Sequence, residues 1–440
     1  MANNKSNAFI FAFIAGFGAF VVGLNLGGIS GALSFIEQEF RLSSMMVGLV
    51  TSALMVGCLA GALLGGGMSD RYGRKPMLFV SALLLLVSAL GCAFASSAAI
   101  LIICRVTAGL GVGILSAVIP TYISEISPAH LRGTFVSFYQ LFVVIGILVA
   151  YCANYGFSSQ ALNWRLMLGM PSAVALLSIL SLLALPESPR WLVGQGDESA
   201  AKAVFQRTGE PEVEGQLTAI KESLKDAAEA GKEKLFQKKY SIPILIAFLI
   251  ATFNQLSGIN AILYYAPRLF ELSGVFREGA MLQSIIVGLT NLTFTMLGMV
   301  LIDKLGRRTL LLIGAVGMVV SQALVAWGFA TGHFQGYMLL LCICGYIAFF
   351  AISLGATIWV VIAEVFPNSV RAQGQAFGSA THWVWSALLT WFFPMFLSIG
   401  GQYIFGIFAV MAALSFVFAL RLPETKNKSL EQIQKELVKK

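Results

Sequence analysis

The sequence predicts an all-α membrane protein whose twelve transmembrane helices form two six-helix bundles, with short cytoplasmic helices between them. Only 11% of its 440 residues are charged and 58% are hydrophobic, whereas a soluble protein keeps about a quarter of its residues charged. Apolar runs of about 20 residues, the length that crosses a bilayer core, follow one another along the chain. A charged motif at 70–75 (Asp-Arg-Tyr-Gly-Arg-Lys) recurs at 303–308 (Asp-Lys-Leu-Gly-Arg-Arg), which indicates two similar halves.

The apolar runs define the expected helices in chain order. Those of the first half lie near 8–34, 45–66, 76–95, 99–121, 134–154 and 165–185. Those of the second half lie near 241–267, 280–302, 309–330, 335–363, 373–398 and 401–421. The polar stretch between them has helical periodicity around 198–206 and 212–229, which favours short amphipathic helices over a flexible linker. We therefore expect an N-terminal bundle, a cytoplasmic linker, a C-terminal bundle and a cytoplasmic tail, at 1–186, 187–240, 241–422 and 423–440.

Lysine and arginine gather on one side of the predicted membrane, which accounts for the net charge of +8 without a nucleic-acid partner. The positive-inside rule makes that side cytoplasmic, with both termini on it. The opposite loops carry little beyond Arg41, Arg268 and Arg277. The basic tail is interpreted as a solvated end, with contact to phospholipid as the alternative. The six cysteines lie in apolar spans and are expected to be buried thiols rather than disulfides or metal ligands.

Two further motifs recur between the halves. Glu125 and Arg132 recur as Glu364 and Arg371, and the Pro-Glu-Ser-Pro-Arg-Trp run at 186–191 recurs more loosely as Pro-Glu-Thr-Lys at 423–426. With Arg105, Gln255-Leu-Ser-Gly-Ile-Asn260 and Tyr264-Tyr265, these motifs make the chain resemble the sugar porter family of the major facilitator superfamily.

This resemblance implies the major facilitator fold and alternating-access transport of a monosaccharide, most simply a hexose such as glucose, with no enzymatic activity and no cofactor. It also implies a multi-pass protein of a bacterial inner membrane that acts as a monomer, with sugar and the lipid bilayer as partners, and with protons as a further partner under the symport alternative. A membrane sugar sensor is the alternative of a different class, but the tail after the last span is short.

A neutral polyol needs side chains that both donate and accept hydrogen bonds, as amides do, and an aromatic face for its C–H surface. The spans supply such groups, and the family resemblance assigns them to sugar binding: Gln140, Asn254, Gln255, Asn260, Tyr264, Asn291, Trp359, His382 and Trp383. The alternative for any one amide is a hydrogen bond that holds helices together. His382 could contact sugar, titrate, or be a satisfied buried imidazole.

Three positions in the second half depart from the family's usual pattern. Asn254 stands where the family usually has Gln. Gly355-Ala356 replaces a Gly-Pro pair, which is expected to remove a helix kink. His382 stands where many hexose carriers have Asn or Gln.

Asn25 bears on energy coupling. The family's proton symporters have Asp at the matching position, as the partner of an arginine that corresponds to Arg105. A carboxylate beside an arginine can bind and release a proton, but Asn25 cannot titrate, which favours uniport. Proton symport, or an Asn that replaces a natural Asp, remains the alternative.

The repeated charges are expected to form a cytoplasmic gate, because in the family that the chain resembles such residues form ion pairs that hold the inner side closed while the outer side is open. The alternative is that they only fix topology. The gate residues are Asp70, Arg71, Arg74, Glu125, Arg132, Glu187, Arg190, Asp303, Arg307, Glu364, Arg371 and Glu424.

Overall fold

The computed structural model consists of helices joined by turns and short connections in the part of the chain that it describes, with no strand there. It describes residues 2–128, 131–209, 212–230, 233–332, 337–367, 369–424, 426 and 437, except for the side chains of 2–6, 132 and 226–230. The first seven helices are α1 (Ala2–Phe40), α2 (Ser44–Tyr72), α3 (Arg74–Ala93), α4 (Ala98–Ile126), α5 (Arg132–Phe157), α6 (Asn163–Gly169) and α7 (Pro171–Leu182). Three short helices follow, α8 (Pro189–Gly194), α9 (Glu198–Thr208) and α10 (Val213–Ala230). The remainder are η1 (Lys238–Tyr240), α11 (Ser241–Leu256), α12 (Ile259–Leu272), α13 (Arg277–Leu305), α14 (Arg307–Thr331), α15 (Met338–Ile352), α16 (Leu354–Val365), α17 (Arg371–Ile399) and α18 (Gly401–Arg421).

Twelve segments among the described residues are long and apolar enough to cross a membrane, as the sequence predicts. Nine of these spans are single helices, whereas α6 with α7, η1 and α11 with α12, and α15 with α16 form the other three. The two helices predicted in the polar stretch are confirmed as α9 and α10, and α8 was not predicted.

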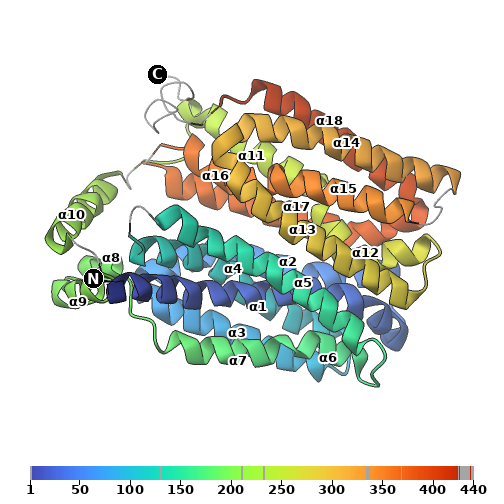
Figure 1. The fold of residues 1–440 in the computed structure, drawn as a ribbon, viewed down its shortest axis with the longest axis horizontal. Coiled ribbons are helices and arrows are strands. Elements are labelled where there is room, and N and C mark those ends of the chain that lie inside the picture. The colour runs from blue at the N-terminus through green and yellow to red at the C-terminus, as the bar shows by residue number, and fades with distance from the viewer. Residues whose placement is uncertain are drawn as a thin grey trace.

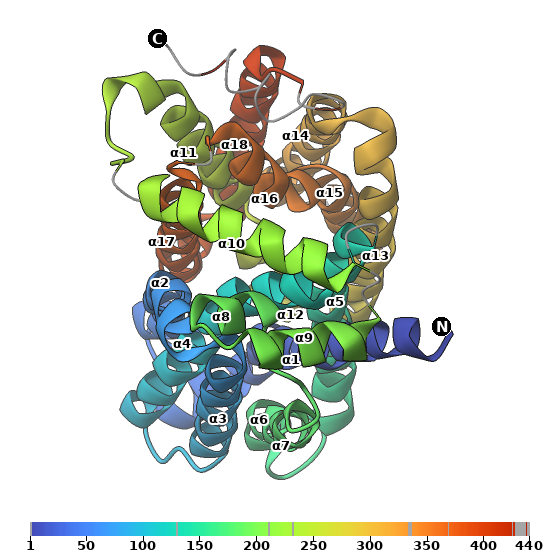
Figure 2. The ribbon, with the colours of Figure 1, turned by 90° about the vertical axis from the view of Figure 1, so that its left-hand side faces the viewer.

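The chain packs as two groups of helices, α1–α7 and α11–α18, which we call the first and second halves (Figure 1). Helices α8, α9 and α10 lie together at one end of the molecule, which we call the linker end. Viewed from that end, α10 crosses between the two halves (Figure 2). We call the other end, which carries the turns between α1 and α2 and between α12 and α13, the opposite end (Figure 1).

Two breaks interrupt helices of the second half. Between α11 and α12, Gly258 has a φ of 94°, a left-handed conformation that favours glycine. The break leaves the Ser257 carbonyl outside the regular helix pattern, and Gln322 Nε2 donates a hydrogen bond of 2.8 Å to it. Polar backbone inside a membrane needs such a partner.

The second break separates α15 from α16 at Ser353 (φ −114°, ψ −97°). The prediction that Gly355-Ala356 removes a kink in this span is therefore wrong. The Ser353 hydroxyl donates to the carbonyl of Phe349 at 2.6 Å, and side chains that hydrogen-bond to the carbonyl four residues earlier often bend helices. A break thus forms here without proline.

Candidate functional site

The polar cluster at the centre of the second half is built around Gln255, at the end of α11. Its Nε2 atom lies 2.9 Å from Asn254 Oδ1 and 3.2 Å from His382 Nδ1. Its Oε1 atom accepts a hydrogen bond of 2.8 Å from Asn260 Nδ2, which also donates to Ser386 Oγ at 2.7 Å. The helix break at Gly258 places Asn260 next to Gln255, so α11, α12 and α17 contribute to one cluster.

Two indole rings flank this cluster. Trp359, on α16, lies 5.0 Å from the His382 ring between centroids, and Trp383 meets the same ring edge-on at 5.1 Å. Because Gln255 Nε2 carries hydrogens, the imidazole nitrogen that faces it must accept, which a neutral ring does and an imidazolium does not. Trp359 is 41% exposed, so an indole surface adjoins amides that can donate and accept hydrogen bonds.

Ser386 is a member of this cluster that the sequence analysis missed. It lies one helical turn after His382 on α17 and is fully buried. A serine in a span carries no signal in the sequence, because most serines bond to their own helix. The contact with Asn260 could be found only from the packing of α12 against α17.

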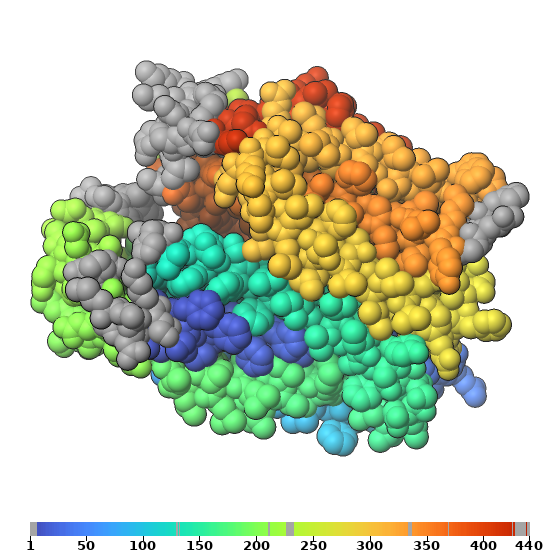
Figure 3. Space-filling view, viewed as in Figure 1, coloured from blue at the N-terminus to red at the C-terminus, as the bar shows by residue number. Residues whose placement is uncertain are grey.

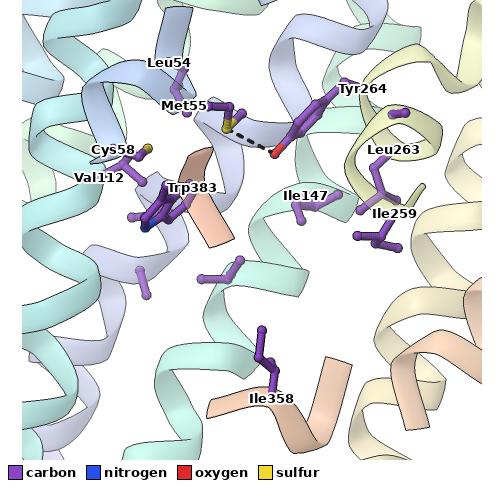
Figure 4. Packing of buried hydrophobic residues seen from close by; sticks show 14 of the residues in the cluster. Leu54, Met55, Cys58, Val112, Ile147, Ile259, Leu263, Tyr264, Ile358 and Trp383 are labelled. Atoms are coloured by element: carbon purple, nitrogen blue, oxygen red, sulfur yellow. Dashed lines mark hydrogen bonds between the residues drawn. The ribbon is translucent and has the colours of Figure 1, made fainter. Parts of the chain in front are cut away.

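The structure leaves three predicted sugar-binding residues outside this hydrogen-bonded cluster. Gln140 is half-buried on α5, in the other half. Asn291 is buried on α13, and within the described residues neither amide has a hydrogen bond. Tyr264 donates from its hydroxyl to Met55 Sδ at 3.9 Å, a contact between the halves (Figure 4).

Asn25 and Arg105 meet in the first half, but not through the Asn25 amide. Arg105 Nη1 donates to the backbone carbonyl of Asn25 at 3.1 Å, while Asn25 Nδ2 donates to Val21 O at 2.9 Å. Arg105 is 1% exposed, and its Nε and Nη2 atoms have no hydrogen-bond partner among the described residues. A buried guanidinium with unpaired N–H groups would be stabilised by any anion or hydrogen-bond acceptor that reaches it.

The repeated charges of the first half form a network at the linker end. Arg74 binds Glu125 through two hydrogen bonds of 2.9 and 3.0 Å and also pairs with Asp70 at 3.0 Å. Glu187 accepts hydrogen bonds from the backbone N–H groups of Arg74 and Lys75, at the start of α3. A carboxylate at this position complements the positive end of the helix dipole.

The second half repeats this arrangement. Arg307 Nη2 binds Glu364 at 3.0 Å, and Arg307 Nη1 lies 3.5 Å from Asp303. Glu424 accepts from the backbone N–H groups of Arg307 and Arg308, at the start of α14. These ion pairs lie inside one half each, so in this conformation they do not latch the halves together.

The other predicted gate residues have different contacts. Arg190 donates to Ser223 Oγ at 3.0 Å and thereby joins α8 to α10. Arg71 lies over the ring of Tyr72. Arg371 Nε donates to the carbonyl of Phe366 at 3.3 Å. The side chain of Arg132 lies outside the described residues.

The halves meet closely at the opposite end. Arg268 on α12 pairs with Glu37 on α1 at 2.8 Å, and Tyr151 donates to the carbonyl of Leu263 at 2.7 Å. A Cβ atom added at Gly48 would lie 1.9 Å from the Trp391 carbonyl oxygen, so α2 and α17 approach with only a glycine between their backbones. At the linker end, by contrast, the surface is hollowed between the halves (Figure 3). These contacts between the halves were not predicted from the sequence.

Comparisons with known proteins agree with this architecture. Residues 11–437 match the family described as “Sugar (and other) transporter”. The chain is 37% identical to the arabinose-proton symporter of Bacillus subtilis, over 97% of this chain and 94% of that protein. It is also 37% identical to a D-xylose transporter of Levilactobacillus brevis, over 98% of this chain and 96% of that protein. A solved structure of the xylose transporter XylE from E. coli, described as partially occluded and inward open, matches with a TM-score of 0.85 and 32% identity, over 96% of this chain and all of that one.

Proposed function

Because the chain belongs to the sugar transporter family of the major facilitator superfamily, we propose that it carries a monosaccharide across the cell membrane through the cluster around Gln255. The observation that carries this proposal is the group of amides beside the exposed Trp359 face. In the described residues, Asn260 Oδ1 has no protein hydrogen bond, so it can accept one from a sugar hydroxyl. The sequence favoured a hexose, whereas the names of the two relatives above favour a pentose, and we propose a pentose as the preferred substrate.

We further propose that the linker end is cytoplasmic and that the structure represents the inward-open state. The basic motifs lie at this end, as the positive-inside rule requires of a cytoplasmic face. Closure by Glu37 and Arg268 at the opposite end, together with the hollow at the linker end, supports this state. The boundaries predicted at 186, 240 and 422 separate the parts that would move, and we propose a functional monomer.

We propose that transport is facilitative. Asn25 donates its amide hydrogen to its own helix and offers no titratable group to Arg105. The B. subtilis relative is named a proton symporter, so proton-coupled transport is the second candidate, for which another group would have to carry the proton.

The test is counterflow uptake of pentoses and hexoses into proteoliposomes, with and without an imposed pH gradient. We expect counterflow exchange of a pentose in both conditions and, in vesicles prepared without internal sugar, uptake that stops at equal concentrations with or without the pH gradient. Proton-driven accumulation by this sequence would overturn the facilitative mechanism. Failure to exchange any monosaccharide by protein that remains folded would overturn the substrate class.

A further inference from the structure

An apolar groove of about 470 Å³ lies at the linker end of the second half, away from the amide cluster. Helices α11 and α17, which form two of its sides, stand next to each other at the edge of the molecule (Figure 2). The groove is open toward its surroundings rather than enclosed. The groove is lined by Phe236, Gln237, Ser241, Ile244, Leu245, Phe248 and Phe377.

The groove begins at the membrane boundary and runs into the apolar span. Phe236 precedes the span that begins at Lys238, and Phe248 lies seven residues into α11. At about 1.5 Å per residue, the helical part of the groove is about 10 Å deep. Phe236 is 74% exposed and packs edge-on against Phe377 of α17 at 5.8 Å. This depth corresponds to the headgroup region and the first part of an acyl chain.

Two lysines lie within two residues, along the chain, of Phe236 and Gln237, which line the membrane-boundary end of the groove, its mouth. Lys234 and Lys238 are exposed, and among the described residues neither has an ion-pair partner. Lys239, in contrast, is held by Glu233 and by the ring of Tyr240. The hydrogen bond from Lys239 is the main cause that lowers the pKa of Glu233 to about 2, so this carboxylate stays charged and paired at neutral pH. The net charge left at the mouth is therefore positive.

We propose that this groove binds an anionic phospholipid, with one acyl chain along α11 and α17 and the phosphate between Lys234 and Lys238. An apolar slot with paired cations at its membrane-surface end complements such a molecule in both shape and charge. A zwitterionic lipid of the same chain length would fill the slot, but its own cation would offset the attraction to the lysines.

The groove belongs to the second half alone. Gln373 on α17 accepts from the backbone N–H of Leu235 at 3.0 Å and donates to the Glu233 carbonyl at 2.8 Å, which ties the segment before η1 to α17. A rigid-body movement of one half against the other leaves these contacts unchanged. Lipid bound here is therefore expected to remain during transport, with an affinity that does not depend on sugar.

The experiment is native mass spectrometry of the full chain with phosphatidylglycerol and phosphatidylcholine of identical acyl chains. We expect phosphatidylglycerol to bind more tightly than phosphatidylcholine, equally with and without sugar. The double variant Lys234→Gln/Lys238→Gln should weaken phosphatidylglycerol binding at least about fivefold and leave phosphatidylcholine unchanged. The matched control is Lys225→Gln/Lys304→Gln, which removes two exposed lysines elsewhere at the linker end and should change neither lipid.

A second pair of variants tests the slot itself. Ile244→Trp, which fills the groove, should weaken both lipids, whereas Leu297→Trp on the exposed surface of α13 should weaken neither. Thermal unfolding identifies any variant that fails to fold. If a lysine variant fails, the two tryptophan variants test the proposal, and if a tryptophan variant fails, the two lysine variants test it. Equal binding of the two lipids by the unaltered protein, or equal loss in both lysine pairs, would overturn the proposal.

Discussion

The ion pair between Glu37 and Arg268 offers the most direct test of how the halves move. It joins α1 to α12 at the opposite end and must break for that end to open. We predict that Arg268→Gln raises the population in which the opposite end is open. The substitution preserves much of the side chain's length and hydrogen-bonding capacity, so the charge is the main change.

The expected size of this effect follows from how exposed the side chains of Glu37 and Arg268 are. The two side chains are 28% and 30% exposed, and a partly exposed pair stabilises by about 0.2–1 kcal/mol. Arg277 lies over the ring of Phe35 at 4.7 Å, beside the same interface, and such a contact adds about 0.5–1 kcal/mol. Loss of the pair alone should therefore shift the ratio of the two states by up to about fivefold, since 1.4 kcal/mol is tenfold. An additional Arg277→Gln change should increase that shift.

The assay is labelling of a cysteine at position 55 by an impermeant maleimide, in a background without the six native cysteines. Met55 is fully buried at the contact between halves, so its replacement should react only when the opposite end opens. The matched control is Arg165→Gln, because Arg165 pairs with Glu39 at the same end but within the first half. Equal labelling rates in the Arg268 and Arg165 variants would refute a closing role for the Glu37 pair.

Three other predictions concern separate parts of the molecule. Gln255→Ala should weaken sugar binding at least about tenfold in calorimetry, because it removes the central amide of the cluster and one of the two acceptors of Asn260 Nδ2, and Ser386→Ala should weaken it less; equal affinity of both variants and the unaltered protein would place the sugar elsewhere. Asn25→Asp should make exchange depend on pH, measured as uptake with an imposed gradient, and unchanged uptake would remove Arg105 from coupling. Glu187→Gln should lower the melting temperature, since an anion at the start of α3 stabilises by about 0.3–1 kcal/mol; an unchanged temperature would deny that role.

Much of the fold could be predicted from the sequence, because each span needs only an apolar run of sufficient length. The breaks within spans were harder to predict. Gly258 allows a left-handed turn, but glycine also serves for close helix packing, so its presence alone does not mark a break. At the Ser353 break, the serine hydroxyl donates to carbonyls of the preceding helix. A serine in a span can bond to its own helix or to another helix, and the sequence does not show which of these bonds forms.

The site was predicted in part for a related reason. Amides inside spans are few, so Gln255 and Asn260 could be selected from the sequence and from the family resemblance. Their partner Ser386 and the pair between Glu37 and Arg268 depend on which faces of distant helices meet. Likewise, the repeat indicated that Glu187 has a role but not that it caps α3, since the backbone N–H groups it binds precede it by more than a hundred residues.

The strengths of the contacts are consistent with two rigid halves and a weaker junction. Within the first half, Arg74 and Glu125 form a bidentate pair with side chains only 8% and 9% exposed, and breaking such a shielded pair leaves a charge poorly solvated. Between the halves, the Glu37 pair is several times more exposed and is solvated when it opens. An alternating-access cycle has to break contacts between the halves, such as the Glu37–Arg268 pair, while contacts within a half, such as the Arg74–Glu125 pair, stay intact. Substitution of Arg74 should therefore destabilise the fold, whereas substitution of Arg268 should shift the equilibrium between states of an intact protein.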